Sequence, residues 1–239
     1  MGYISFPGAA TDYASTVDTA ELSIVGNIEI VAKVTLDDWS PTTGTVILSK
    51  AVNSTNRGYV FDVQDATGKL RLQWTEGGGT SIAQVSTAGF LFTDGDTGWV
   101  KATLDVDNDA SGYDLDFFKS SDTTDDPDSV NWTKVGDTVV GGATTDIEDN
   151  AAVLRHGWNL SFNYGGPCDL HYCQVKSGIG GSLVYDANFT DLTVGEVAAK
   201  EFVEDSVNAA TVTLNGVLWT YTFDGEPINR TNIVFVAAD

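Results

Sequence analysis

The carboxylate-rich stretch TLDVDNDASGYDLDFF contains the residues most able to do chemistry. Asp105, Asp107 and Asp109 stand at i, i+2 and i+4, the spacing with which an EF-hand-like loop presents its first calcium ligands. Ala110 occupies the place where such a loop needs glycine, and Asp116 stands where it needs its closing glutamate. The sequence therefore favours a polar hairpin turn. A calcium-binding loop is the alternative, and no other cofactor is expected.

The histidines and cysteines do not form a recognisable motif. His156 and His171 belong to no Ser/His/Asp or metal-binding pattern, which favours structural roles for both. Cys168 and Cys173 lie in one expected strand, where five residues separate the Cα atoms by about 16 Å, beyond the reach of a disulfide. Reduced thiols are the prediction.

The charge of the chain excludes several partners. The 239 residues include 34 acidic and 12 basic ones, for a formal net charge of -22, and no Lys/Arg cluster offers a counter-charge to phosphates. Nucleic acid and anionic membranes are therefore not expected partners. No apolar run is long enough to span a bilayer, and the first residues lack the pattern of a signal peptide. We expect a soluble protein made in the cytoplasm.

Alternation of apolar and polar residues predicts strands along the whole chain. In NIEIVAKVTL the alternate residues from Ile28 to Leu36 share one face, whereas Glu29, Lys33 and Thr35 share the other, which predicts a half-buried strand. The same pattern recurs in YVFDVQ, KLRLQW and WVKATLDV. Many short strands separated by polar turns predict an all-β sandwich or barrel.

Turn and helix signals refine this picture. Glycine-rich turns separate the strands, and Asn215-Gly216 predicts a tight hairpin. The segment 193–207 has apolar residues at helical spacing but contains Gly195, so an irregular connection is favoured over a helix. The acidic loop SSDTTDDPDS is predicted to be a solvated turn before Trp132.

The order of motifs along residues 3–220 resembles a known superfamily. ISFPGAATDYASTVDTAELSI, GNIEIVAKVTLDDW, LRLQWTEGG, GWVKATLDVDNDASGYDLDFFKSSD, NWTKVG and LHYCQVKSGIGGSLVYDANF follow one another in that order. This succession resembles the laminin G-like branch of the concanavalin A-like lectin/glucanase superfamily, in the version found in bacteriophage structural proteins. The resemblance implies an all-β, two-sheet antiparallel jelly-roll sandwich over residues 1–220, followed by a C-terminal extension at 221–239.

The resemblance also suggests functions. Retaining glucanases of the superfamily place two carboxylates on one strand in a pattern like E-x-D-x-x-E, because the two groups must lie close together. Asp114 and Asp116 alternate suitably but have no glutamate partner, and Glu29 stands alone. The protein is therefore predicted not to be an enzyme, with a glycoside hydrolase as the least favoured alternative.

A virion structural role is the main functional prediction. We expect a decoration or accessory protein on the outer surface of a bacteriophage capsid or tail, contacting the major capsid or tail protein lattice and forming a homo-oligomer. The apolar strand predicted at Ile233, Val234, Phe235 and Val236 would add to a sheet of this chain or a neighbour, because an exposed apolar strand invites pairing.

A carbohydrate-binding adhesin module is the alternative function. Sugar sites need an aromatic platform with a few polar groups on a rigid scaffold. Trp39, Trp99, Trp132 and Trp158 are expected at strand ends or on outward positions, so some could stack on a glycan. The competing interpretation is that Trp132 and Trp158 cover the ends of the sandwich.

Overall fold

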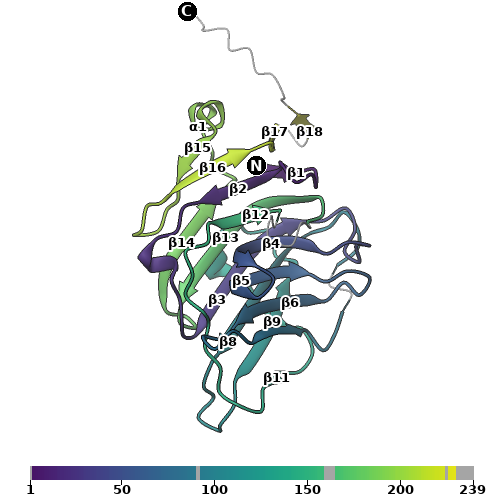
Figure 1. Cartoon of the computed structure of the whole chain (residues 1–239). Helices are drawn as coiled ribbons and strands as arrows, with labels where there is room; N and C mark the ends of the chain where they lie inside the picture. Colours follow the sequence, from purple (N-terminus) through teal and green to yellow (C-terminus); the bar gives the residue numbers. More distant parts are fainter. Residues whose placement is uncertain (1, 90–91, 159–164, 224–225, 230–239) are drawn as a thin grey trace, which may run out of the picture.

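Two antiparallel sheets build the protein, one layer over the other (Figure 1). The computed structural model describes residues 2–89, 92–158, 165–223 and 226–229. The larger sheet has the strand order β10 (Thr133–Lys134), β9 (Asp114–Ser120), β8 (Thr97–Asp105), β3 (Ile28–Thr35), β13 (Cys168–Ser177), β1 (Gly2–Phe6), β17 (Leu218–Phe223), β18 (Glu226–Asn229), with β11 (Val139–Val140) beside β9 and β14 (Ser182–Asn188) beside β13. The smaller sheet has the order β15 (Glu201–Val203), β16 (Thr211–Asn215), β2 (Tyr13–Thr16), β12 (Leu154–Gly157), β4 (Thr45–Asn53), β5 (Asn56–Val63), β6 (Leu70–Thr75), β7 (Ser81–Val85). The predicted all-β jelly-roll sandwich is confirmed.

The core lies between the sheets and uses the predicted inward faces. The alternate residues from Ile28 to Leu36 are fully buried. The predicted inward residues of β5, β6 and β8 are buried as well: Tyr59, Phe61, Val63, Leu70, Leu72, Trp74, Val100, Ala102 and Leu104. Full burial of a large aliphatic or aromatic side chain contributes roughly 1.5–3 kcal/mol, so the alternating pattern is the main stabilising feature.

Part of the outward face of the larger sheet is also covered. Lys33 is 3% exposed and Glu29 is 7% exposed, although both lie on the polar face of β3. A second apolar cluster lies on this side of the sheet, built from Val31, Trp99, Val130 and Tyr172 with Trp132 packed against it. The prediction of a half-buried β3 is therefore wrong for Lys33 and Glu29 on its polar face. The segment between β9 and β10 folds back over Lys33, whereas Glu29 pairs with Lys176 and accepts from the amide of Gly180.

The acidic stretch forms the predicted hairpin. β8 and β9 pair along their length, up to Asp105 opposite Asp114. At the tip, the amide of Asn108 donates to the carbonyl of Gly112 at 2.9 Å. Asp109 takes a left-handed conformation, with φ of 59°. Local hydrogen bonding therefore closes the turn.

Asn215 and Gly216 do not form the predicted tight hairpin. β16 pairs with β2 in the smaller sheet, whereas β17 pairs with β1 in the larger one. The chain therefore crosses between the sheets at this point. Gly216 has φ of +62°, and an added Cβ would lie 2.6 Å from the carbonyl oxygen of Thr11, so the crossing requires glycine.

A short helix, α1 (Val194–Ala199), replaces the irregular connection favoured by the sequence. Thr193 Oγ1 accepts from the amide of Glu196 at 3.2 Å, and Glu196 Oε2 accepts from the amide of Thr193 at 2.8 Å. This reciprocal capping box satisfies two amides at the helix start. Lys200 adopts a left-handed conformation, with φ of 59°, which ends the helix. Two 3-10 turns, η1 (Ala20–Leu22) and η2 (Pro127–Ser129), complete the described helical elements.

The larger sheet continues past the predicted boundary at residue 220, which falls within β17. β18 pairs with β17, with Asn229 opposite Thr220. The strand predicted at residues 233–236 lies outside the described residues. In the described part of the chain, the helices are too short to be membrane-spanning segments.

Candidate functional site

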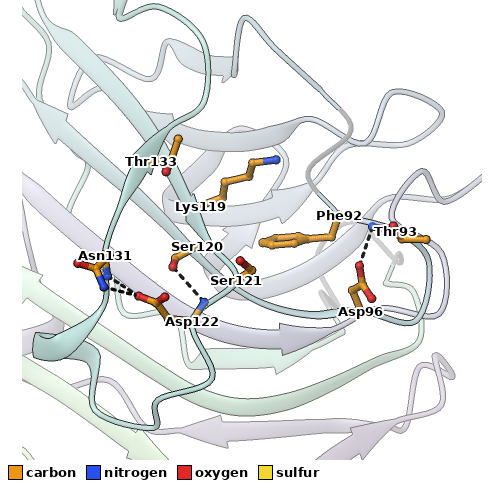
Figure 2. A pocket seen from close by; sticks show the side chains of 9 residues that line it. All are labelled: Phe92, Thr93, Asp96, Lys119, Ser120, Ser121, Asp122, Asn131 and Thr133. Atoms are coloured by element: carbon orange, nitrogen blue, oxygen red, sulfur yellow. Dashed lines mark hydrogen bonds between the residues drawn. The ribbon is translucent and has the colours of Figure 1, made fainter.

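A surface pocket of about 710 Å³ opens where β9 ends (Figure 2). Its walls come from the loop that leads into β8, the end of β9, β10, and the two ends of the loop between β9 and β10. This β9–β10 loop covers part of the outward face of the larger sheet and is called the covering loop below. The lining residues are Phe92, Thr93, Asp96, Lys119, Ser120, Ser121, Asp122, Asn131 and Thr133. They combine an aromatic ring with several hydrogen-bonding groups, which is typical of a site for a small polar ligand.

Phe92 forms an aromatic wall that is fixed from behind. Its ring centroid lies 4.6 Å from that of Trp39. The backbone amide of Trp39 donates to Asp94 Oδ1 at 2.8 Å, and its indole donates to the carbonyl of Asp96 at 3.1 Å. Gly98 leaves room for the ring, because a Cβ there would lie 2.2 Å from Phe92 Cζ. The aromatic wall is therefore held by packing on rigid neighbours.

Asp122 forms a second wall and is held by amide donors. Asn131 donates to Asp122 Oδ2 twice, from its backbone amide at 2.6 Å and from its side chain at 3.0 Å. The amide of Asp122 donates in turn to Ser120 Oγ at 3.1 Å. The two Asn131 donors, with a smaller contribution from Ser120, lower the pKa of Asp122 below its ordinary value. Figure 2 shows the bonds between Asn131 and Asp122, which link the two sides of the loop.

Buried Lys33 ties this loop to the sheet. Its Nζ donates to the carbonyls of Thr123 and Thr124 at 3.1 and 2.9 Å and pairs with Asp125 Oδ1 at 2.6 Å. An ammonium has three N–H groups, so all of them find acceptors here. The indole of Trp99 adds a bond to the carbonyl of Thr124 at 3.1 Å. The wall that contains the carboxylate is therefore anchored to the larger sheet.

Lys119 and Asp96 supply opposite charges on the remaining walls. Lys119 Nζ lies 5.5 Å from the centroid of the Phe92 ring, within cation–π range. Asp96 Oδ2 accepts from the amide of Thr93 at 3.1 Å. With the hydroxyls of the serines and threonines, the pocket presents both donors and acceptors around one aromatic face.

The four tryptophans named as candidates for stacking on a sugar fall into two groups. Trp39 and Trp99 are 2% and 0% exposed, so they cannot stack on a ligand. Trp132 and Trp158 are partly exposed. Lys101 Nζ lies 4.4 Å from the centroid of the Trp132 ring, so the ammonium occupies part of one face of that ring. The aromatic ring that lines the pocket is Phe92, which was not predicted from the sequence.

The carboxylates of the β8–β9 hairpin mostly serve the hairpin itself. Asp105 Oδ1 and Asp107 Oδ1 accept from backbone amides two residues later, at 3.3 and 3.2 Å. Asp114 Oδ1 accepts from Asn108 at 2.8 Å, and Asp116 pairs with Lys134 at 2.8 Å. Over the described residues, no group of three or more His, Cys, Asp or Glu side chains is placed to hold a metal ion.

Both histidines are buried and hydrogen-bonded, as expected for structural residues. His156 contacts the carbonyl of Ile47 at 3.0 Å and the hydroxyl of Tyr185 at 2.8 Å through its two ring nitrogens, and burial lowers its pKa to about 4. His171 Nε2 contacts Thr35 Oγ1 at 2.9 Å, and burial, reinforced by the charge of Lys33, lowers its pKa to about 4. Neither residue lines the pocket.

Cys168 and Cys173 are buried free thiols in one strand, β13, as predicted. Burial raises the pKa of both thiols, so they remain protonated at neutral pH. They contribute to the core rather than to chemistry.

Comparison with known proteins identifies the fold. No family model and no curated protein matches the chain. A solved heptameric SAP-like pentraxin from Limulus polyphemus superposes with a TM-score of 0.54 and 14% identity, covering 91% of this chain and 94% of that one. A putative carbohydrate binding protein from Bacteroides ovatus gives a TM-score of 0.55 and 13% identity, covering 95% of this chain and 62% of that one. Domains LG4-5 of the mouse laminin alpha1 chain give a TM-score of 0.46 and 12% identity, covering 74% and 42%.

The two higher TM-scores indicate a shared fold at low sequence identity. The predicted two-sheet antiparallel jelly-roll fold is therefore confirmed. The bacteriophage setting stays a prediction.

Proposed function

We propose that the protein is a carbohydrate-binding domain and that its ligand occupies the pocket between Phe92 and Asp122. The observation that carries this proposal is an aromatic wall and a fixed carboxylate that line one pocket. A sugar ring has an apolar C–H face that packs on an aromatic ring, and a rim of hydroxyls that hydrogen-bond to carboxylates and amides.

The walls of the pocket are held in place before a ligand arrives. Trp39 supports Phe92, Asn131 holds Asp122, and Lys33 anchors the loop. Binding is stronger when fewer side chains must be ordered, since each immobilised flexible side chain costs roughly 0.5–1.5 kcal/mol. This arrangement supports the binding of small ligands that offer few contacts.

The fold is compatible with this role but does not decide it. One solved neighbour is described as a putative carbohydrate binding protein and another as an SAP-like pentraxin. A single fold hosts many functions, so the residues of the pocket support the proposal more strongly than the likeness does.

A glycan array probed with the full chain, with and without a chelator, tests the proposal. Phe92→Ala should weaken binding of the strongest glycan about tenfold, because it removes the platform. Phe118→Ala is the matched control: Phe118 lies on β9 and, like Phe92, is partly exposed, but it contacts Lys101 and does not line the pocket. Equal losses in both variants, or no binding on the array, would contradict the proposal.

The proposed role is binding without catalysis. Asp114 and Asp116, the carboxylates closest to a glycosidase arrangement in the sequence, interact with Asn108 and Lys134. Neither aspartate lines the pocket. Release of reducing ends from β-glucans by the purified chain would contradict this part of the proposal.

The virion surface is where we propose that this binding takes place. The proposal rests on the resemblance of the motif order and on the net charge of -22, which suits a surface kept away from packaged nucleic acid. Quantitative mass spectrometry of purified particles tests it. A ratio near one copy per capsid subunit supports a decoration protein, a few copies per particle support a tail protein, and absence from particles contradicts both.

A further inference from the structure

The charges around the pocket discriminate between classes of sugar, if the proposed function is correct. Among the nine lining residues, Lys119 is the one cation, and Asp96 and Asp122 are the two anions. The cation also lies against the ring of Phe92. An acidic sugar would therefore meet two carboxylates and a single ammonium.

Each carboxylate is held in place by hydrogen bonds to its Oδ2 atom. Both bonds from Asn131 end on Asp122 Oδ2, and the bond from Thr93 ends on Asp96 Oδ2. An ionised carboxylate only accepts hydrogen bonds, so a ligand group that contacts Asp96 or Asp122 must be a donor. Sugar hydroxyls are such donors, whereas a sugar carboxylate is not.

The Asn131 donors also keep Asp122 charged. Neutralising it would require a proton on a group whose ionised form is stabilised by two amide bonds. Asp122 therefore cannot readily become a hydrogen-bond donor to an acidic ligand. The net charge of -22 adds a weaker, long-range repulsion of anions.

We propose that the pocket selects uncharged hexopyranoses, which donate hydroxyls to Asp96 and Asp122 while one sugar face packs on Phe92, and that it rejects sialic and uronic acids. Lys119 and the neighbouring hydroxyls then serve as donors to the ring and hydroxyl oxygens of the sugar. Like charges placed opposite each other are the usual means by which an interface rejects the wrong partner.

Calorimetry with matched sugar pairs tests this selectivity. The pairs are lactose with α2,3-sialyllactose, and cellobiose with cellobiouronate, each titrated into the full chain. We expect at least one uncharged sugar to bind tenfold or more tightly than its acidic counterpart. The difference should narrow between 50 and 500 mM salt, because salt screens the repulsion of exposed charges.

Asp96→Asn supplies the decisive variant. It keeps the size of the side chain and removes one charge, so it should narrow the preference for the uncharged sugar by several-fold. Thr133→Ala is the control, since it changes the lining without changing its charge. Equal or tighter binding of the acidic sugars by the unaltered chain would overturn the selectivity alone. Failure of every sugar to bind would overturn the proposed function and this inference together.

Discussion

Two acidic loops of the larger sheet use their carboxylates in different ways. At the tip of the β8–β9 hairpin, Asp105 and Asp107 accept amides from their own turn. In the loop between β9 and β10, Asp122 accepts from Asn131, across the loop, and lines the pocket. The hairpin is closed by bonds between residues close in sequence, whereas the covering loop is held by Lys33 from a distant strand.

The difference shows how a carboxylate becomes available to a ligand. In the hairpin the carboxylates are acceptors for the turn that they form. In the covering loop an ammonium from the sheet satisfies two backbone carbonyls, so the loop does not depend on all of its own side chains. Rigid support from below is what allows a polar group in a loop to hold a fixed position at a site.

Removing the contacts between Lys33 and the loop that joins β9 to β10 should have the largest effect on stability. Lys33→Met removes a buried ammonium that holds three acceptors. We expect the free energy of unfolding to fall by roughly 2–4 kcal/mol, because two carbonyls and one carboxylate lose their donor. Denaturation in urea measures the change, and sugar binding should weaken in the same variant.

Asp107→Asn in the β8–β9 hairpin is the matched comparison for Lys33→Met. Its effect should stay within about 0.5 kcal/mol, since a surface side chain amide keeps an accepting oxygen for the turn. If the two variants lost equal stability, the proposed contrast between the loops would be wrong.

Displacing the aromatic wall should have an intermediate effect. Gly98→Ala places a methyl group 2.2 Å from the present position of Phe92 Cζ, so the ring must move. We expect a loss of about 1–3 kcal/mol in stability, as for other overpacked sites, and loss of sugar binding. Thermal unfolding and calorimetry measure the two effects.

Gly26→Ala is a suitable control for the wall, because an added Cβ at Gly26 meets no atom within 4 Å. It should leave sugar binding unchanged. Unaltered binding in Gly98→Ala would indicate that the ring is not held in one position, contrary to the structure.

Removing the amide donor should have the smallest effect on the fold. Asn131→Ala deletes one of the two Asn131 bonds to Asp122 and should move the pKa of that carboxyl up towards its ordinary value. A lowered pKa in the folded state stabilises the protein above the unfolded pKa, and this contribution is lost as pH falls through the folded pKa. The variant should therefore lose part of this stabilisation at neutral pH.

Carboxyl chemical shifts followed by NMR during a pH titration measure that change. Asp126 is the internal control: hydrogen bonds from Ser129 and from the amide of Asp128 lower its pKa. This pKa should be the same in the variant as in the unaltered protein. An unchanged pKa of Asp122 in the variant would mean that the backbone amide of Asn131 alone determines it.

The fold could largely be predicted from local patterns. Alternation places the core residues of β3, β5, β6 and β8 correctly, because one buried face imposes a period of two on each strand. The capping box at Thr193 and Glu196 is likewise a local signal, but it was missed, and an irregular connection was predicted where α1 forms. Asn215-Gly216 misleads because the same dipeptide suits any sharp change of direction, here a crossing between sheets.

The pocket could not be predicted in the same way. Lys33 has the pattern of an outward residue on a strand, and its burial depends on a loop about 90 residues later in the chain. The position of Phe92 depends on Trp39 and on the space above Gly98. These contacts leave no periodic trace, since each joins segments that are distant in sequence.

The place of β1 in the larger sheet affects how the protein folds as it is made. Ile4 pairs with Leu170 on one side and with Trp219 on the other, so both neighbours of β1 are synthesised much later than β1 itself. At 5–20 residues per second, the ribosome needs roughly ten seconds or more to reach the first of them. During that time neither sheet partner of β1 is present, so we expect a chaperone that holds the nascent amino terminus to raise the yield of folded protein.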